Sequence, residues 1–326
     1  MNAKKIVYLL LREAGIGVAL VLICVFFIFA APRFASHTNL MNIFTQISIN
    51  TVISVGMTFV ILLGGIDLSV GSVLALCAVT AGLTITNESL PVGVAIFLAV
   101  LVSVSVGALC GLFNGFVSER WKIHSFVVTL GMLNIARGAA LQVTDSRTIF
   151  MFPEAFSNLG AKTVLGLPVI FIMALTFVII GSIVLNKSVF GRMIYAIGNN
   201  EEAVRLSGHN TIVYKISAFV ICGAAVGVAG IMYMLRLNMA SPILGVGFEL
   251  NAIAAVVIGG TSMMGGKGSL IGTFLGASII GVLNNGLLLL GMGDFARQIV
   301  TGLIIVAAVV IDTYRNKVLI KFQENE

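Results

Sequence analysis

Long apolar runs, nearly free of charge and separated by short polar breaks, constrain this chain more than any other feature. Residues 92–118, for example, contain no charged side chain, and a helix needs about 20 residues to cross a bilayer. Only 10% of the residues are charged, whereas a soluble domain carries about 25%. Transmembrane β-strands are roughly ten residues long and alternate in polarity, unlike these runs. The sequence therefore predicts an all-α polytopic membrane protein.

The runs predict about ten transmembrane helices within a single transmembrane domain over residues 1–326. The expected spans are residues 14–31, 44–63, 67–84, 92–118, 124–142, 165–186, 216–236, 248–262, 268–290 and 295–312. Lysine and arginine gather in the loops on the side of the two termini, which places both termini in the cytoplasm. The basic N-terminus has the outline of a signal peptide, but its apolar run is long enough to span, so we expect an uncleaved first helix.

Two loops are long enough to have a function of their own. Residues 143–164 are expected on the periplasmic side, and residues 187–215, the most charged segment, on the cytoplasmic side. In the second loop, the stretch EEAVRLSG has the spacing of a short amphipathic helix, and Gly208 is a favoured C-terminal stop. A solvated charged loop would look similar; a helix presented to a cytoplasmic partner is the sharper interpretation.

The stretch GGIDLSVGS, residues 64–72, places a carboxylate between two spans. Gly64 and Gly65 free the backbone to break the helix, and Asp67 can then cap the next one. A charge in hydrocarbon costs roughly 2.5–3.5 kcal/mol on insertion scales, so Asp67 must face protein, water or the interface. Two compatible interpretations follow: a capped re-entrant turn, or a polar break that lines a cavity, as in transporters with discontinuous helices.

A second stretch, AVVIGGTSMMGGKGSLIGT at residues 255–273, resembles the first, so the two could be copies of one hairpin with broken or short helices. We expect structural turns at Gly64, Gly65, Gly71, Gly259, Gly260, Gly265, Gly266 and Gly268. The second stretch also resembles a phosphate-binding loop, whose pattern is GxxxxGK[ST]. Thr261 stands where that pattern needs its first glycine, and Gly268 follows Lys267 in place of Ser or Thr. We therefore expect no nucleotide site here.

Polar side chains inside the spans are candidates for a substrate pathway, because such residues are costly in a membrane. The candidates are Asp67, Ser69, Ser72, Asn114, Asn134, Arg137 and Asn284. Asn134 and Arg137 are three residues apart and share a helix face. The alternatives are interhelical hydrogen bonds for the asparagines and, for Arg137, a hydrogen bond or a salt bridge to Asp67 or Glu249.

No cluster of residues indicates a metal site, a cofactor or a catalytic centre. Four cysteines lie inside apolar runs without CxxC or Cys/His spacing, and we interpret them as small buried hydrophobic residues. Three histidines form no ligand cluster. The net charge of +6 reflects lysines and arginines in cytoplasmic loops and does not indicate a nucleic-acid partner.

In its order of motifs the chain resembles the permease family of bacterial ABC importers for simple sugars, of the ribose, xylose, arabinose and autoinducer-2 type. The segments that match its pattern, covering nearly the whole chain, are GMTFVILLGGIDLSVGSVLAL, FVVTLGMLNIARG, GRMIYAIGNNEEAVRLSG and ELNAIAAVVIGGTSMMGGKGSLIGTFLGASIIGVLNNGL. The resemblance implies a permease dimer in the lipid of the inner membrane, formed with a second copy or a paralogue. It also implies a cytoplasmic ATP-binding cassette protein and a periplasmic sugar-binding protein as partners.

The same resemblance implies a site for coupling to the ATPase. Permeases of ABC importers carry an E-A-A-x-x-x-G element on a cytoplasmic coupling helix. Glu202, Ala203 and Gly208 match it, while Val204 replaces the third small residue. The expected coupling residues are Asn200, Glu201, Glu202, Ala203, Arg205, Leu206 and Gly208.

The resemblance thus implies translocation of a monosaccharide or similar small polyol by alternating access, driven by ATP hydrolysis on a separate subunit. Two other functions stay open at this point. An ion-coupled secondary transporter would use Asp67 and Arg137 as a coupling pair, and the related ABC permeases for branched-chain amino acids share the architecture. A membrane-embedded enzyme would need a cluster of His, Asp or Glu with suitable spacing, which the sequence lacks.

Overall fold

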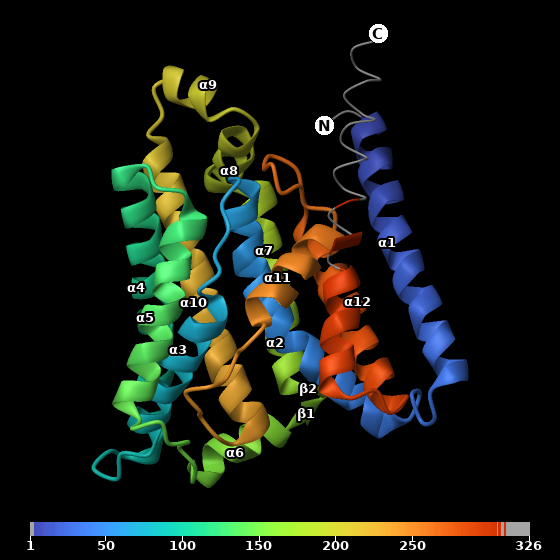
Figure 1. Cartoon of the computed structure of the whole chain (residues 1–326), viewed down its shortest axis with the longest axis vertical. Coiled ribbons are helices and arrows are strands. Elements are labelled where there is room, and N and C mark those ends of the chain that lie inside the picture. The colour runs from blue at the N-terminus through green and yellow to red at the C-terminus, as the bar shows by residue number, and fades with distance from the viewer. Residues whose placement is uncertain (1–2, 305, 308–309, 311–326) are drawn as a thin grey trace.

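A computed structural model of the chain describes residues 3–304, 306–307 and 310 as a bundle of helices (Figure 1). The helices are α1 (Ala3–Ala30), α2 (His37–Leu62), α3 (Val70–Ile85), α4 (Val92–Trp121), α5 (Ser125–Val143), α6 (Glu154–Ala161), α7 (Val169–Lys187), α8 (Val189–Asn199), α9 (Glu201–Leu206), α10 (Thr211–Leu237), α11 (Phe248–Ile258) and α12 (Leu270–Leu289). Residues 294–304 are also helical. A short antiparallel pair, β1 (Thr163–Val164) and β2 (Leu167–Pro168), is the one addition to the predicted all-α architecture among the described residues.

Six helices, α2, α4, α5, α7, α10 and α12, are long and apolar enough to cross a membrane, which confirms a polytopic membrane protein. The apolar part of α1, α3 and α11 are shorter. The span expected to be short, residues 248–262, contains the 11-residue α11. Two helices begin before their apolar runs, α2 at His37 and α10 at Thr211. Polar caps explain this, since Ser36 and Asn210 accept hydrogen bonds from amides in the first turns.

The core of the bundle is built around α2. Every residue from Thr51 to Leu62 is buried, and α2 packs against α7, α10, α11 and α12. Burial on all sides is typical of a helix at the centre of a bundle. At the edge of the bundle, α4 and α5 expose broad apolar faces that include Phe97, Leu101 and Ile135.

Small residues let α4 and α10 approach closely. A Cβ added at Gly111 would overlap the Phe219 carbonyl group. Ser103 on α4 donates a hydrogen bond to the Gly227 carbonyl oxygen at 2.7 Å. Close backbone approach of this kind holds helices together in lipid, where burial of apolar surface gives no net driving force.

The two long loops carry secondary structure and lie at opposite ends of the bundle (Figure 1). The outer segment, residues 143–164, contains α6 and leads into the β1–β2 hairpin. Neither element was predicted, because each is formed by too few residues to give a clear sequence pattern. The inner segment, residues 187–215, contains α8 as well as α9. The short helix predicted for EEAVRLSG is confirmed, because α9 ends at Leu206 and Gly208 follows with a φ of +85°.

Gly111→Ala should destabilise the folded protein, because the added methyl group would have to displace the α10 backbone. Overpacking of this kind costs about 1–3 kcal/mol, so the midpoint of thermal unfolding in detergent should fall by several degrees. The matched control is Gly93→Ala on the same helix, where nothing lies within 4 Å of the added Cβ. Equal midpoints for the two variants would contradict the close packing of α4 on α10.

Candidate functional site

Both Gly-Gly segments end a helix in the same way. After α2, Gly64 has a φ of +76°, and the Gly65 amide donates to the Val60 carbonyl oxygen at 3.0 Å. After α11, Gly260 has a φ of +79°, and the following amide donates to the Val256 carbonyl oxygen at 3.0 Å. This closure around a left-handed glycine is the Schellman motif. The likeness between the two sequence stretches therefore corresponds to one shared way of stopping a helix.

The chain then returns into the bundle without helical structure. Residues 63–69 lie outside any helix, and Figure 1 shows them running back from the end of α2 alongside the bundle before α3 begins at Val70. The Ile66 peptide is held by two hydroxyl groups of α5. Its N–H donates to Ser125 Oγ at 3.1 Å, and its carbonyl oxygen accepts from Thr129 Oγ1 at 3.4 Å. We call residues 63–69 the α2–α3 break.

Asp67 is the central acceptor of the break and is 2% exposed. Its Oδ1 accepts from the Ser69 amide at 2.9 Å and from Ser69 Oγ at 2.6 Å. Asn114 Nδ2 on α4 donates to Asp67 Oδ2 at 3.5 Å and to Ser69 Oγ at 3.0 Å. The expectation that Asp67 caps the next helix is wrong in detail, because Ser69 is the N-cap of α3 and makes no side-chain capping bond. Asp67 instead ties the break to α4, and this satisfies buried donors that would otherwise be costly.

A second short helix begins next to this group. Residues 238–247 enter the bundle from the opposite end and lead into α11, whose N-cap is Gly247 (Figure 1). Glu249 Oε1 accepts from the Gly247 amide at 3.2 Å. A Cβ at Gly71, in the first turn of α3, would overlap both the Gly245 carbonyl oxygen and the Glu249 carboxylate. Gly71 was predicted as a turn; the structure places it in a helix, where the close approach requires glycine.

Two helix N-termini thus meet inside the bundle, each beside a carboxylate. The unpaired amides and dipole of a helix N-terminus favour negative charge. Asp67 lies just before α3, and Glu249 lies in the first turn of α11. The two short helices therefore begin close together inside the bundle, as half-helices do in transporters with discontinuous helices.

The glycines of the second stretch join α11, α12 and the end of α2. Gly265 and Gly266 have positive φ, and the Gly266 amide donates to the Leu62 carbonyl oxygen at 2.8 Å. The carbonyl oxygen of Gly268 accepts a hydrogen bond from the hydroxyl group of Tyr195, on α8, at 2.9 Å. A Cβ at Gly259 would overlap α12 at Gly272.

The structure brings only part of the predicted pathway together. Ser72 is buried in α3, near Asp67 in sequence and on the same short helix that Ser69 begins. Arg137 donates a hydrogen bond to the carbonyl oxygen of Pro242, in the segment before α11. None of the salt bridges among the described residues joins Arg137 to Asp67 or to Glu249.

Two of the predicted asparagines lie elsewhere. Asn134 is exposed on α5 and donates at 3.1 Å to the Leu130 carbonyl oxygen of its own helix. Asn284 lies on α12, and its Oδ1 accepts a hydrogen bond from Thr301 Oγ1 at 3.4 Å. Figure 1 shows α12 on the side of the bundle away from α3, α4 and α5.

A polar face of α2 was not predicted. Polar side-chain atoms of Asn50, Thr51 and Ser54 are buried and have no hydrogen-bond partner within the described part of the chain. Further along the helix, Thr58 Oγ1 lies 2.8 Å from Thr273 Oγ1 of α12. The signal was present in the sequence, because Asn50 and Ser54 are four residues apart and therefore share a face of the helix.

A cavity of about 690 Å³ lies at the α9 end of the bundle. The α2–α3 break, the turn between α4 and α5, α9 and the first turns of α10 surround it. Glu201, Glu202 and Arg205, all predicted coupling residues, line this cavity. The cavity thus separates the predicted coupling helix from the break that contains Asp67.

The predicted coupling residues form an exposed, well-capped helix. Asn200 Oδ1 accepts from the Ala203 amide at 2.9 Å and caps α9. Glu202 and Arg205 form a salt bridge of 2.6 Å while both remain largely exposed. The hydrogen bond from Arg205 lowers the pKa of the Glu202 carboxyl. Leu206, at the end of α9, is 77% exposed.

Comparison with known proteins identifies the family. Residues 39–309 match the family described as "Branched-chain amino acid transport system / permease component". The chain belongs to this family. It is therefore a permease component of an ABC import system and an integral inner-membrane protein. No solved structure matches the chain.

Curated relatives cover nearly the whole chain. The ribose import permease protein RbsC of Haemophilus influenzae is 42% identical over 91% of this chain and 92% of its own length. RbsC of Escherichia coli is 41% identical over 86% of this chain and 88% of its own. The L-arabinose transport system permease protein AraH of Escherichia coli is 38% identical over 91% of this chain and 90% of its own length.

Asp67→Leu should destabilise the protein more than Asp67→Asn. Leucine leaves the Ser69 amide and the Ser69 hydroxyl without an acceptor and removes one of the two acceptors of the Asn114 amide, and an unsatisfied buried group costs about 1–3 kcal/mol. Asparagine keeps one acceptor oxygen. Thermal unfolding of the purified variants in detergent measures the difference. If Asp67→Leu is as stable as Asp67→Asn, the carboxylate does not hold the break.

Proposed function

We propose that this protein translocates a monosaccharide or a similar small polyol across the bacterial inner membrane, as the permease of an ABC importer. The observation that carries the proposal is the similarity to ribose permeases at 42% and 41% identity over most of each chain. The similarity to an L-arabinose permease points to the same class of neutral sugar. The family description mentions branched-chain amino acids, but these relatives favour a sugar.

Transport proceeds by alternating access that a separate ATPase drives. ATP binding closes two nucleotide-binding halves of that partner, and the exposed helix α9 transmits the movement to the bundle. The permease itself needs no cofactor, since ATP is bound by its partner. The capped, solvent-exposed geometry of α9 and its position beside the cavity support this role.

The topology that fits this role has about ten membrane-spanning helices and two cytoplasmic termini. The end of the bundle with α8 and α9 then faces the cytoplasm, and the end with α6 and the β1–β2 hairpin faces the periplasm (Figure 1). Residues 187–215 serve as the coupling segment. A periplasmic sugar-binding protein delivers the sugar at the opposite end, where residues 143–164 lie.

The translocation pathway lies between two permease subunits, along the exposed face of α5. Asn134 is polar and exposed there, a position that is unfavourable against lipid. Nothing lies within 4 Å of a Cβ added at Gly131 or Gly138 on the same helix, which leaves space for a sugar or a facing helix. A second copy or a paralogue covers this face. The group around Asp67 is closed to solvent in this conformation and reaches the pathway only when the helices move.

Reconstitution in vesicles with the ATPase and the sugar-binding protein tests the proposal. Uptake of labelled ribose or arabinose should require ATP inside the compartment that holds α9 and should persist in the presence of an uncoupler. Uptake that an uncoupler abolishes and ATP depletion does not would instead indicate an ion-coupled secondary transporter. A ligand screen of the binding protein that returns leucine or valine and no sugar would overturn the substrate class.

Glu202→Ala and Gly208→Val should uncouple ATP hydrolysis from transport. Glu202 is exposed on α9, and Gly208 has a φ of +85°, where a residue with a side chain costs about 1–2 kcal/mol. In the reconstituted system, sugar transported per ATP hydrolysed should fall severalfold. Lys187→Ala, also exposed in the coupling segment, is the control and should retain the ratio. Normal transport with full stimulation of the ATPase in both test variants would contradict the coupling role.

A further inference from the structure

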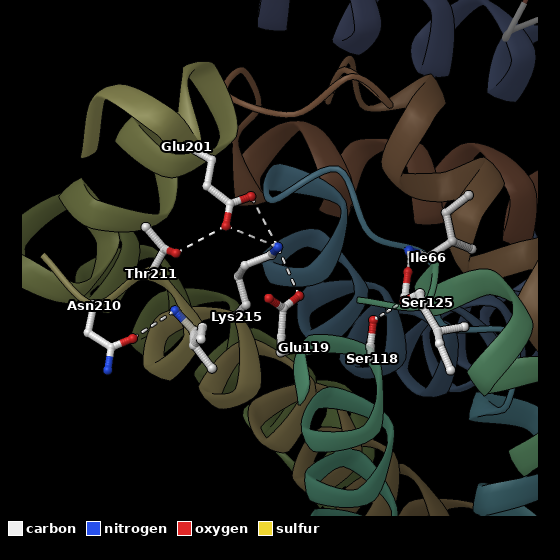
Figure 2. Close-up of polar contacts among 10 residues, drawn as sticks. Ile66, Ser118, Glu119, Ser125, Glu201, Asn210, Thr211 and Lys215 are labelled. Carbon is white, nitrogen blue, oxygen red and sulfur yellow. Dashed lines mark hydrogen bonds and ion pairs between the residues drawn. The ribbon is translucent and has the colours of Figure 1, made fainter. Parts of the chain in front are cut away.

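Lys215 joins two carboxylates from different parts of the chain (Figure 2). Its Nζ lies 2.8 Å from Glu119 Oε1, at the end of α4, and 3.1 Å from Glu201 Oε2, at the start of α9. Thr211 Oγ1 donates a further hydrogen bond to Glu201 at 3.0 Å. We call Glu119, Lys215 and Glu201 the charge triad.

The triad is more than a solvated surface pair. The side chains of Lys215 and Glu119 are only 20% and 13% exposed and that of Glu201 is 44% exposed, whereas the Glu202–Arg205 pair on α9 is 59–66% exposed. Ion pairs that are shielded from water are less screened than exposed ones, and removal of one member leaves a partly buried charge unpaired. Because Lys215 is shared, displacement of α9 changes the environment of Glu119 as well.

The turn that follows Glu119 is tightly closed and leads directly to the break. Ser118 Oγ donates to the Ile123 carbonyl oxygen at 2.7 Å. The next helix, α5, begins with Ser125, whose hydroxyl oxygen accepts the Ile66 N–H at 3.1 Å. Ile66 immediately precedes Asp67. Figure 2 shows the triad and the Ser125–Ile66 bond on the two sides of the α4 end.

We propose that the charge triad is the connection through which the position of α9 controls the α2–α3 break. Lys215 is the positioning residue at its centre: it holds α9 against the end of α4, and the α4–α5 turn in turn holds Ile66 through Ser125. The cavity of about 690 Å³ between α9 and the break leaves room for α9 to move. When α9 moves, Glu201 withdraws from Lys215, the α4–α5 turn is released, and the break opens beside Asp67. This inference rests on the proposed coupling of α9 to an ATPase.

Hydrogen–deuterium exchange of the purified permease tests the connection without any partner. Lys215→Met should speed exchange of amides in residues 63–69 at least about fivefold, because local opening sets the exchange rate. Lys215→Arg, which keeps the charge, should restore slow exchange. Lys187→Met is the control: Lys187 is an exposed lysine outside the α4–α5 turn and forms no salt bridge in the described part of the chain. Wild-type exchange of residues 63–69 in Lys215→Met would overturn the proposal.

A double-mutant cycle separates the connection from general stability. Glu119→Gln and Lys215→Met should each speed exchange at residues 63–69, and the double variant should add little to either, because both break one interaction. Additive effects would overturn the proposal. Exchange in α12, which lies on the side of the bundle away from α3, α4 and α5 (Figure 1), should stay at the wild-type rate. A rise there equal to that at 63–69 would show global destabilisation and count against the proposal.

The reconstituted importer distinguishes failure of this inference from failure of the proposed function. If the wild-type permease imports sugar at the expense of ATP, Lys215→Met should lower sugar transported per ATP hydrolysed by roughly fivefold or more, in the range of known coupling energies. Lys215→Arg should recover most of the ratio. If Lys215→Met transports as much sugar per ATP hydrolysed as the wild type, the proposed role of the charge triad is overturned and the proposed function stands. A wild-type permease without ATP-dependent import overturns the proposed function and this inference with it.

Discussion

A backbone that leaves the helical path inside a bundle of membrane helices must find its hydrogen-bond partners within the protein, since lipid offers none. The α2–α3 break meets this requirement partly within itself and partly with side chains from two other helices. Asp67 accepts hydrogen bonds from the amide and hydroxyl of Ser69. Ser125 and Thr129 of α5 bond the backbone N–H and carbonyl oxygen of Ile66, and Asn114 of α4 donates to Asp67 and Ser69. The positions of α4 and α5 therefore depend on the break as much as the break depends on them.

Glycine makes the same arrangement sterically feasible. The α4 and α10 helices touch through backbone at Gly111, which brings Asn114, one turn further along α4, within reach of Ser69. At the other side of the break, Gly71 lets α3 lie against the start of α11. The same neighbouring residues thus provide the close helix contacts and the hydrogen bonds to the buried Asp67. A change in one of these residues therefore disturbs the contacts of the others.

The sequence alone predicted most of the long helices, the two Gly-Gly stops and the short helix at EEAVRLSG, because apolar runs, glycine pairs and amphipathic spacing are local signals. It missed α6, α8 and the β1–β2 hairpin, and it placed the starts of α2 and α10 several residues too late. It did not predict which side chains form hydrogen bonds with the buried polar groups. Asn114 is 47 residues from Asp67, Ser125 is 59 residues from Ile66, and Asn39 pairs with Asn285 across 246 residues. Such pairings depend on helix packing, which a single sequence does not encode in any local pattern. For the same reason Asn284, a plausible pathway residue by type, proved to lie apart from Asp67.

The contact between Gly71 and Gly245 has a mechanical consequence. From this point α3 runs towards the end of the bundle with α6, and α11 runs towards the end with α8 and α9 (Figure 1). The two half-helices therefore touch only where they begin, with no side chain at Gly71 to lock their relative angle. Such a point contact can serve as a pivot, about which one half of the protein tilts while the other stays in place. A protein that opens first to one side of a membrane and then to the other can use such a pivot to change the angle between its two halves.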